Sequence, residues 1–512
     1  MGDSAAAAHL ESLILRMLSG GVDVAAAEAE LRARSQSRGA GRPLLLLATS
    51  SAHEAARQMG ALLVRRSICS IWSRSRDEAA RAALGASLLS ALAREPSRAV
   101  RKALVSVVAA LGKVALDGGA AGWPELNALL QHASVDAREE IRELALLLVH
   151  ELADALSSSS LKRLISPMLR APILAGLHDA SAAVRLAALR ATGALFLTLE
   201  SPAAHRALAP TLPPLLAALR AALGNDAGNS EDVAAVVMEA LGELVTRRSP
   251  LLNDAAAAAA IAELMIATLA ARTLETNTRG AAAEVLSALL CAQSALWVAR
   301  GDLLRDLLGA IVSVASERDA AVAESRMLEA AAAGLARADV ADDAPDALVQ
   351  NLLDVAANEL PTSTLGPPLF ATLVAAAGAP APALRRAAFS LLGSAAEGLS
   401  DAIQTALPSV LGLVAQGAAD TDATVREGAA YALAMIAEAA QPAIRRSGPA
   451  LLAPVLVLLN DASPGVALRA CWALENAADA LPGDAVAPVA DAAIGSLSTL
   501  MARPLDGPLG IT

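Results

Sequence analysis

The sequence repeats itself with a period of 41 residues between positions 384 and 481, and this repeat restricts the chain to a narrow class of folds. Leu384, Val425 and Val466 each follow a short turn and each open an alanine-rich helical segment. A unit of this length is a helix pair that cannot bury its own apolar face, so neighbouring units must stack. We therefore predict an all-α fold, a HEAT/armadillo-type right-handed α-solenoid of stacked antiparallel helix pairs.

The same signal returns near the N-terminus. Val100, Ile141 and Val184, each followed by arginine, are 41 and 43 residues apart, and the register is looser between Val184 and Leu384. By the usual repeat length the chain holds roughly ten helix pairs. We predict three parts: N-terminal repeats at 1–155, middle repeats of irregular register at 156–370, and regular 41-residue repeats at 371–512 that stop after the first helix of a last pair.

Composition agrees with helices and argues against several other classes. The chain is 55% hydrophobic but only 2% aromatic, and it lacks the alternating apolar pattern of strands. Its most apolar window, 255–271, is interrupted by Glu263, so we expect no membrane insertion. The three cysteines are far apart and the N-terminus carries no secretory signal, which favours a soluble intracellular protein. Prolines are expected at helix starts, at Pro213, Pro214, Pro408, Pro454 and Pro488.

No enzyme motif is present. GxGxxG, GxxxxGK[ST], HExxH and GxSxG are all missing from the sequence. Two His–Glu dyads, His53-Glu54 and His150-Glu151, resemble those that hold di-iron centres in HEAT-type hydroxylases. A di-metal site needs ligands from several facing helices, and two dyads 97 residues apart are too few. We predict a non-enzymatic protein without metal or cofactor.

Several segments resemble importin-β-type nuclear transport receptors. In the N-terminal domain of that family a helix carrying Arg-Gln and then a basic pair is followed closely by Trp, as in Arg57-Gln58, Arg65-Arg66 and Trp72. Further on, Gly122–Leu126 resembles the Trp-Pro segment of the third repeat in these receptors, and Arg469–Asn476 is similar to an Ala-Cys-Tyr-Ala-Leu-Glu-Asn segment in the branch of importins four and five. The resemblance extends in order over nearly the whole chain and implies the N-terminal half of such a receptor.

This resemblance implies a nuclear import receptor. Such a protein binds basic cargo in the cytoplasm, crosses the pore through weak contacts with FG-repeat nucleoporins, and releases the cargo when the small GTPase Ran binds in its GTP form in the nucleus. The related branch carries ribosomal proteins and histones. The matched motif places the Ran-binding candidates at Arg57, Gln58, Arg65 and Arg66. The alternative is a HEAT-repeat scaffold of the phosphatase-subunit or microtubule-binding type, unrelated to Ran.

A column of carboxylates predicts where cargo binds. Thirteen residues after the repeat openings stand Asp154, Glu397, Glu438 and Asp479, and Trp472 and Asn476 share the helix phase of Asp479. With a formal net charge of −11, such a surface would attract basic protein segments and nuclear localisation signals and repel nucleic acid. The alternative is an ordinary solvated helix face. Our candidates for cargo binding are Glu397, Tyr431, Glu438, Trp472, Asn476 and Asp479.

Overall fold

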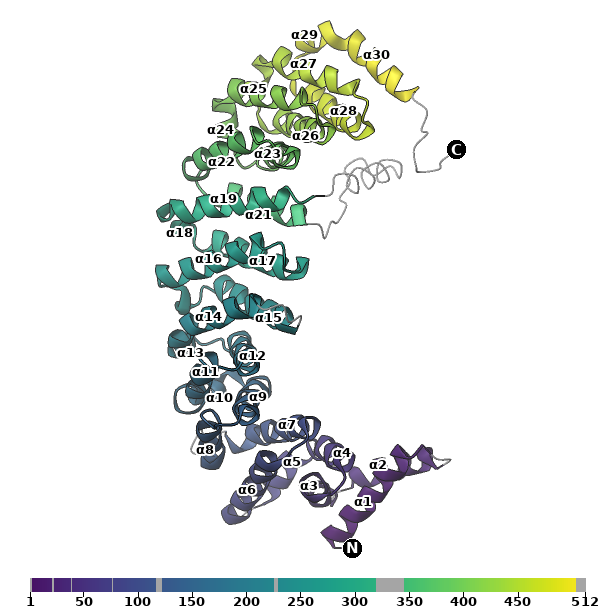
Figure 1. Ribbon diagram of the computed structural model, residues 1–512, viewed down its shortest axis with the longest axis vertical. Coiled ribbons are helices and arrows are strands. Elements are labelled where there is room, and N and C mark those ends of the chain that lie inside the picture. The colour runs from purple at the N-terminus through teal and green to yellow at the C-terminus, as the bar shows by residue number, and fades with distance from the viewer. Residues whose placement is uncertain are drawn as a thin grey trace. The chain divides into compact units, whose positions relative to one another are not determined.

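The computed structural model describes residues 2–20, 23–37, 39–75, 77–116, 122–224, 229–318 and 345–502. Within these ranges every regular element is a helix, and consecutive helices form hairpins that stack on one another, so the predicted all-helical HEAT-repeat solenoid is confirmed (Figure 1). The chain divides into two compact units, Met1–Ala257 and Ala258–Thr512. The three-part division at 155 and 370 stays a prediction.

In the first unit, the second helices of successive hairpins, α4, α7, α9, α12 and α15, pack side by side in one layer (Figure 1). The helices of this unit are α1 (Asp3–Leu18), α2 (Val24–Ser35), α3 (Gly41–Ser50), α4 (Glu54–Val64), α5 (Ile68–Arg74), α6 (Glu78–Arg94), α7 (Arg98–Ala115), α8 (Pro124–Ala133), α9 (Glu139–Ala155), α10 (Ser158–Leu164), α11 (Arg170–Leu177), α12 (Ala182–Thr198), α13 (Pro202–Leu208), α14 (Leu212–Leu223) and α15 (Asn229–Thr246).

In the second unit, α17, α21, α23, α26 and α28 form the corresponding layer of second helices. Its helices are α16 (Ala255–Ala270), α17 (Thr276–Ala292), α18 (Ser294–Ala299), α19 (Gly301–Ala315), α21 (Pro345–Glu359), α22 (Thr362–Ala377), α23 (Pro382–Ser394), α24 (Ser400–Thr405), α25 (Leu407–Ala418), α26 (Ala423–Ala439), α27 (Gly448–Leu459), α28 (Pro464–Ala480), α29 (Gly483–Val486) and α30 (Ala490–Met501). The last of these packs against α27, and residues 503–512 lie outside the described part.

The turn before each second helix explains the 41-residue repeat. Ser463 caps α28 by accepting a hydrogen bond from the backbone N–H of Val466, and Asp422 caps α26 in the same way through Thr424. Val425 and Val466, which open the two repeats, are fully buried. A polar cap followed closely by a buried valine therefore starts each of these helices and directs its apolar face into the stack.

The arginine that follows the opening residue joins one repeat to the next. Arg426 donates to the carbonyls of Asp420 and Thr421 in its own turn, and through Nε and Nη2 to both carboxylate oxygens of Asp461 in the following turn, at 2.6 and 2.9 Å. Arg385 binds Asp420 in the same way. We call these ion pairs the arginine ladder; its other members are Arg57–Glu95, Arg142–Asp179 and Arg279–Glu317.

The prolines lie mostly where they were expected. Pro213 and Pro408 are in the first turns of α14 and α25, where the missing N–H breaks no helical hydrogen bond. Pro488 lies in a short 3-10 turn just before α30. The prediction for Pro454 is wrong, because it lies inside α27; that helix begins at Gly448, and the neighbouring Pro449 takes the first-turn position.

Over the ranges that the structure covers, no helix is both long and apolar enough to cross a bilayer. Cys69, Cys291 and Cys471 are free thiols. Trp123, predicted to lie in the core, is 2% exposed and its ring lies 6.2 Å from that of Trp72.

Candidate functional site

The four candidate Ran-binding residues lie in or just after α4, and their surroundings differ. Arg57 belongs to the arginine ladder: its Nε and Nη2 donate to Glu95 at 2.8 and 2.9 Å, and its Nη1 donates to the carbonyl of Ser51. Burial alone would raise the pKa of Glu95, but the hydrogen bonds from Arg57 and from the Ser97 N–H outweigh it and lower that pKa. Arg57 therefore holds neighbouring repeats together in this structure.

Gln58 lies beside a small apolar groove. The groove is about 210 Å³ in volume and runs between α1 and α4. Leu18 and Leu62, which line it, are 60% and 47% exposed. The remaining lining residues are Ile14, Met17, Ala55 and Met59. An apolar side chain of a partner could be buried here next to the polar amide of Gln58.

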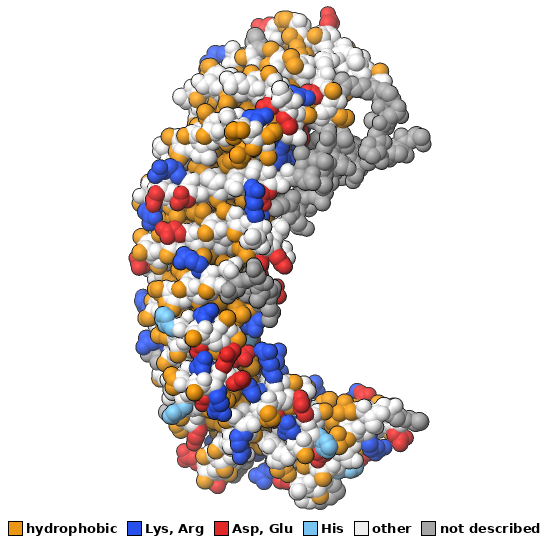
Figure 2. Space-filling view, in the orientation of Figure 1, with side chains coloured by type: hydrophobic (Ala, Val, Ile, Leu, Met, Phe, Trp, Pro, Cys, Tyr) orange, Lys and Arg blue, Asp and Glu red, His pale blue; other side chains and the backbone are white. Residues whose placement is uncertain are grey.

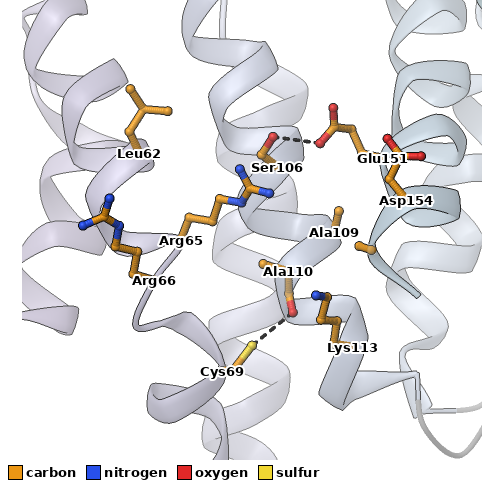
Figure 3. Close-up of a pocket in the computed structure, with 11 residues that line it drawn as sticks. Leu62, Arg65, Arg66, Cys69, Ser106, Ala109, Ala110, Lys113, Glu151 and Asp154 are labelled. Atoms are coloured by element: carbon orange, nitrogen blue, oxygen red, sulfur yellow. Dashed lines mark hydrogen bonds between the residues drawn. The ribbon is translucent and has the colours of Figure 1, made fainter. Parts of the chain in front are cut away.

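Arg65 and Arg66 open onto a larger pocket of about 880 Å³, which also contacts α5, α7 and α9. Figure 3 shows the two arginines on one side of the pocket and two carboxylates, Glu151 and Asp154, on the other. Both arginines are exposed and neither has an ion-pair partner among the residues that the structure describes. The pocket thus presents separate positive and negative walls to a partner.

Two polar side chains inside this pocket are held by hydrogen bonds. Ser106 Oγ donates to Glu151 at 2.8 Å, which fixes one carboxylate of the negative wall. Cys69 Sγ donates to the carbonyl of Ala110 at 3.1 Å (Figure 3). Lys113 on α7 also lines the pocket, and Figure 3 shows it apart from the two arginines. These hydrogen bonds hold the Ser106, Glu151 and Cys69 side chains in fixed positions.

The predicted carboxylate column is present in the second unit. Glu397 follows the end of α23, and Glu438 and Asp479 lie near the C-terminal ends of α26 and α28. All three are exposed, and the three helices pack side by side. The structure therefore brings one accessible carboxylate from each of three consecutive repeats to the same end of the helical layer. Asp154, the fourth residue at this repeat position, belongs to the first unit and lies in the pocket of Figure 3.

Two aromatic side chains lie next to the column. The rings of Tyr431 on α26 and Trp472 on α28 are 5.8 Å apart and tilted by 47°. Gly393 on α23 makes room for the tyrosine, since a Cβ at this glycine would lie 2.6 Å from a ring carbon of Tyr431. Three neighbouring helices therefore cooperate to place the aromatic pair.

Asn476 differs from the expectation that it lies on the open face with Trp472. Its side chain is 8% exposed, and its amide donates to the carbonyl of Ala434 at 2.9 Å and to Glu438 at 3.3 Å. Asn476 lies four residues after Trp472 on α28, and at this position its side chain points toward α26, where the Ala434 carbonyl accepts its hydrogen bond. Asn476 thus links α28 to α26 and orients the carboxylate of Glu438.

Arg469 is a residue of this surface that the sequence interpretation missed. Its guanidinium carbon lies 5.2 Å from the ring centre of Tyr431 and 5.6 Å from that of Trp472. Burial lowers the pKa of Arg469, and the nearby Glu427, at 3.9 Å, opposes that shift. Its spacing of three residues from Trp472 places both side chains on one helix face, so the sequence did contain the signal.

The described residues contain no group of three or more His, Cys, Asp or Glu side chains arranged to hold a metal ion. Of the two dyads, His53 is the residue just before α4, and His150 lies on α9, 3.8 Å from Asp154. In the space-filling view, basic and acidic side chains are intermixed on the face that is drawn (Figure 2).

The helix pairs form a HEAT-type helical scaffold, and second helices of its second unit carry exposed carboxylates beside half-buried aromatic rings. A family model described as "IPO5-like, TPR repeats" matches residues 96–258, and a "HEAT-like repeat" model matches residues 382–436 and 425–477. "Probable importin subunit beta-4" of Schizosaccharomyces pombe is 35% identical over 98 residues, which are 19% of this chain and 9% of that protein.

Solved structures of Kap121p are similar over almost the whole chain. Kap121p alone superposes with a TM-score of 0.74 at 22% identity, and Kap121p bound to RanGTP with a TM-score of 0.72 at 22% identity; each match covers 98% of this chain and 47% of Kap121p. Kap121p has also been solved bound to Pho4p and to Nup53p. The match to the IPO5-like model over residues 96–258 and the likeness in fold to Kap121p confirm the predicted resemblance to importin-β-type receptors, nearest the branch of importins four and five. It spans about half the length of Kap121p.

Proposed function

We propose that this chain is the cargo-binding and Ran-binding part of a nuclear import receptor. It takes up basic proteins, such as ribosomal proteins or histones, in the cytoplasm. It crosses the nuclear pore by weak contacts with FG-repeat nucleoporins and releases its cargo when RanGTP binds in the nucleus. The chain would thus shuttle between the two compartments. It makes and breaks no covalent bond, because GTP hydrolysis belongs to Ran.

The observation that carries the proposal is the carboxylate column on a chain that resembles importin-β-type receptors. Packed helices are about 8–10 Å apart, and an extended peptide advances about 3.3 Å per residue. A peptide that crosses the layer of second helices would therefore meet Glu397, Glu438 and Asp479 with about every third side chain. Basic residues at that spacing would each approach a carboxylate, while Tyr431 and Trp472 would contact the apolar parts of the peptide.

Ran binding is proposed for the first unit. Support comes from the matched motif and from Kap121p, which has been solved in complex with RanGTP. Arg65, Arg66 and the pocket beside them offer exposed charges of both signs, and the groove at Gln58 offers exposed leucines. In this proposal Arg57 contributes indirectly, by keeping α4 stacked on the following repeat through Glu95.

A capture experiment tests the Ran part of this function. The purified chain is mixed with immobilised Ran loaded with GTP or with GDP, and selective capture by the GTP form is expected. Arg65→Glu combined with Arg66→Glu should weaken capture at least about tenfold, since two favourable charges become repulsive. The matched control reverses two exposed cations on first helices, Arg94→Glu and Lys162→Glu, and should retain binding. Failure of the folded chain to capture either form would favour a HEAT scaffold unrelated to Ran.

A charge reversal tests the cargo part. Glu397→Lys, Glu438→Lys and Asp479→Lys together should abolish binding of a basic peptide while the far-UV circular dichroism stays unchanged, because all three side chains are exposed. The control makes the same change of net charge at exposed residues near first helices, with Asp306→Lys, Asp401→Lys and Asp484→Lys. Equal binding by the two triple variants would disprove the role of the column.

A further inference from the structure

The guanidinium of Arg469 is a cation with little to neutralise it. Arg469 donates no hydrogen bond to any residue that the structure describes, and its Nε is buried without an acceptor. The nearest carboxylate, Glu427, is 3.9 Å away and is shared with Arg318 at the same distance. The indole Nε1 of Trp472 also lacks an acceptor among the described residues. Two donors therefore lie next to each other without strong acceptors.

The charge of this surface changes sign along α28. Arg469 lies near the beginning of the helix, and Asp479 lies ten residues further on, close to its end. At a rise of 1.5 Å per residue, the two positions are separated by about 15 Å along the helix axis. Glu438, on the neighbouring α26, lies at the negative end and is hydrogen-bonded to Asn476. The surface therefore has a positive end and a negative end.

We propose that the surface formed by α26 and α28 recognises a protein segment of mixed charge, and this rests on the cargo-binding function proposed above. Basic side chains of the segment bind Glu438 and Asp479, and a carboxylate of the same segment binds Arg469. An extended chain covers 15 Å in about four or five residues, which sets the distance between its acidic and basic side chains. A purely basic segment would leave the donors at the positive end without an acceptor.

The contacts of Arg469 also restrict what the aromatic pair can do. Arg469 already lies over the rings of both Tyr431 and Trp472. A lysine of the cargo placed on the same ring faces would meet a like charge in a partly desolvated site, which is unfavourable. A carboxylate would instead form charge-assisted hydrogen bonds with the guanidinium. Arg469 therefore favours a carboxylate of the cargo segment at its own end of α28. The cargo lysines bind instead at the carboxylate column.

Two synthetic peptides that differ in one residue test the inference. Both carry lysines about three residues apart; one has glutamate about five residues from the nearer lysine, and the other has glutamine there. Titration calorimetry with the whole chain should show the glutamate peptide binding at least about tenfold more tightly. Arg469→Gln should remove that difference, and Arg469→Lys should restore part of it because it keeps the charge. The control Arg446→Gln removes an exposed cation of the same unit and should leave the preference intact.

Each outcome distinguishes the inference from the proposed function. Equal binding of the two peptides to the unaltered chain overturns the inference, even if Arg469→Gln proves unstable. An equal gain for both peptides in Arg469→Gln also overturns it, because the arginine would then only repel cations. If both peptides bind and depend on Glu438 and Asp479, the proposed function stands in either case. If neither peptide binds, the cargo function fails and the inference fails with it.

Discussion

At the scale of single residues, the aromatic pair depends on a glycine. In Gly393→Ala the new Cβ would lie 2.6 Å from the Tyr431 ring, so the ring must move away from its position beside Trp472. Alanine favours the helix by about 0.5–1 kcal/mol, but overpacking costs about 1–3 kcal/mol, and a net loss of about 1 kcal/mol is expected. Near-ultraviolet circular dichroism and peptide titration would detect the displaced ring and an affinity lowered about threefold.

Gly412→Ala is the matched control for this change. Gly412 also lies inside a helix of the second unit, α25, but a Cβ there would meet nothing within 4 Å. This variant should be slightly more stable than the unaltered chain and should bind peptide normally. A similar response of both variants would show that the space at Gly393 does not set the position of the Tyr431 ring beside Trp472.

A buried histidine in the first unit makes stability depend on pH near neutrality. His205 is 3% exposed; its Nε2 lies 2.9 Å from the carbonyl of Leu199 and its Nδ1 2.9 Å from Ser249 Oγ. Burial lowers the pKa of His205 below its usual 6.5. Below pH 6.5 the unfolded chain therefore binds more protons than the folded chain, and the free energy of unfolding falls as the pH falls, by at most about 1.4 kcal/mol per pH unit.

Chemical unfolding of the first unit at pH 7.5 and pH 5.5 would measure this effect. His205→Gln should be less stable at pH 7.5 but should lose less stability than the unaltered chain on going to pH 5.5. His132→Gln changes an exposed histidine and should keep the original pH dependence. If His205→Gln and the unaltered chain lose equal stability, another group causes the acid sensitivity.

For single residues, the sequence repeat predicts exposure but not the contacts of a side chain with other helices. Glu438 and Asp479 are exposed because a residue thirteen positions after a buried opening valine faces outward at the end of the helix. Asn476 could not be placed in this way, because its amide turns toward the carbonyl of Ala434 on another helix. The ion pair of Arg57 with Glu95 was missed because it joins residues 38 positions apart in sequence.

At the scale of helices, the arginine ladder should determine how firmly neighbouring repeats hold together. Asp461 accepts two hydrogen bonds from Arg426, and both side chains are mostly buried. Arg426→Ala would leave this carboxylate without its partner and should destabilise the contact of α26 with α28 by about 3 kcal/mol. Hydrogen exchange should become faster in α26 and α28 first, since each repeat contacts only its neighbours.

The double variant Arg426→Ala/Asp461→Ala tests whether the ion pair itself is responsible. Its loss of stability should be smaller than the sum of the losses in the two single variants, because neither charge is then left unpaired. Arg446→Ala removes an exposed arginine of the same unit and should not change exchange in these helices. Strict additivity of the two single variants would show that the pair is not coupled.

Acid should weaken the ladder for the same reason. The hydrogen bond from Arg385 lowers the pKa of Asp420, against the opposing effect of burial. The stability from this pair is therefore complete above the ordinary pKa of about 3.8 and is lost as the pH falls through the lower folded-state value. Asp420→Asn should be less stable at neutral pH and should show a smaller further loss of exchange protection near pH 3 than the unaltered chain.

The sequence predicts those helices that follow the 41-residue repeat. The caps at Ser463 and Asp422 and the buried valines that follow them recur every 41 residues and define α26 and α28 directly. Pro454 was misplaced because a proline can lie inside a helix when packing compensates for the lost hydrogen bond. The first helices of the pairs vary in length and are sometimes broken into two pieces. A period measured on the second helices therefore cannot predict where the first helices begin and end.

At the scale of the whole molecule, the candidate Ran-binding residues belong to one compact unit and the candidate cargo residues to the other. The proposed function therefore does not require RanGTP and cargo to compete for the same side chains. Release would instead follow if RanGTP and cargo favour different conformations of the solenoid, so that each weakens binding of the other. Such coupling is thermodynamically reciprocal, and this property makes it measurable in both directions.

We expect RanGTP to lower the affinity of this chain for a basic peptide about tenfold, which corresponds to a coupling free energy of about 1.4 kcal/mol. Saturating peptide must then lower the affinity for RanGTP by the same factor. The variant with Glu397→Lys, Glu438→Lys and Asp479→Lys should bind RanGTP normally but no longer respond to peptide. Since the chain spans about half of Kap121p, both ligands bound with no mutual effect would show that release depends on repeats outside this chain. A peptide effect on RanGTP that persists in the triple variant would instead place the cargo contact elsewhere.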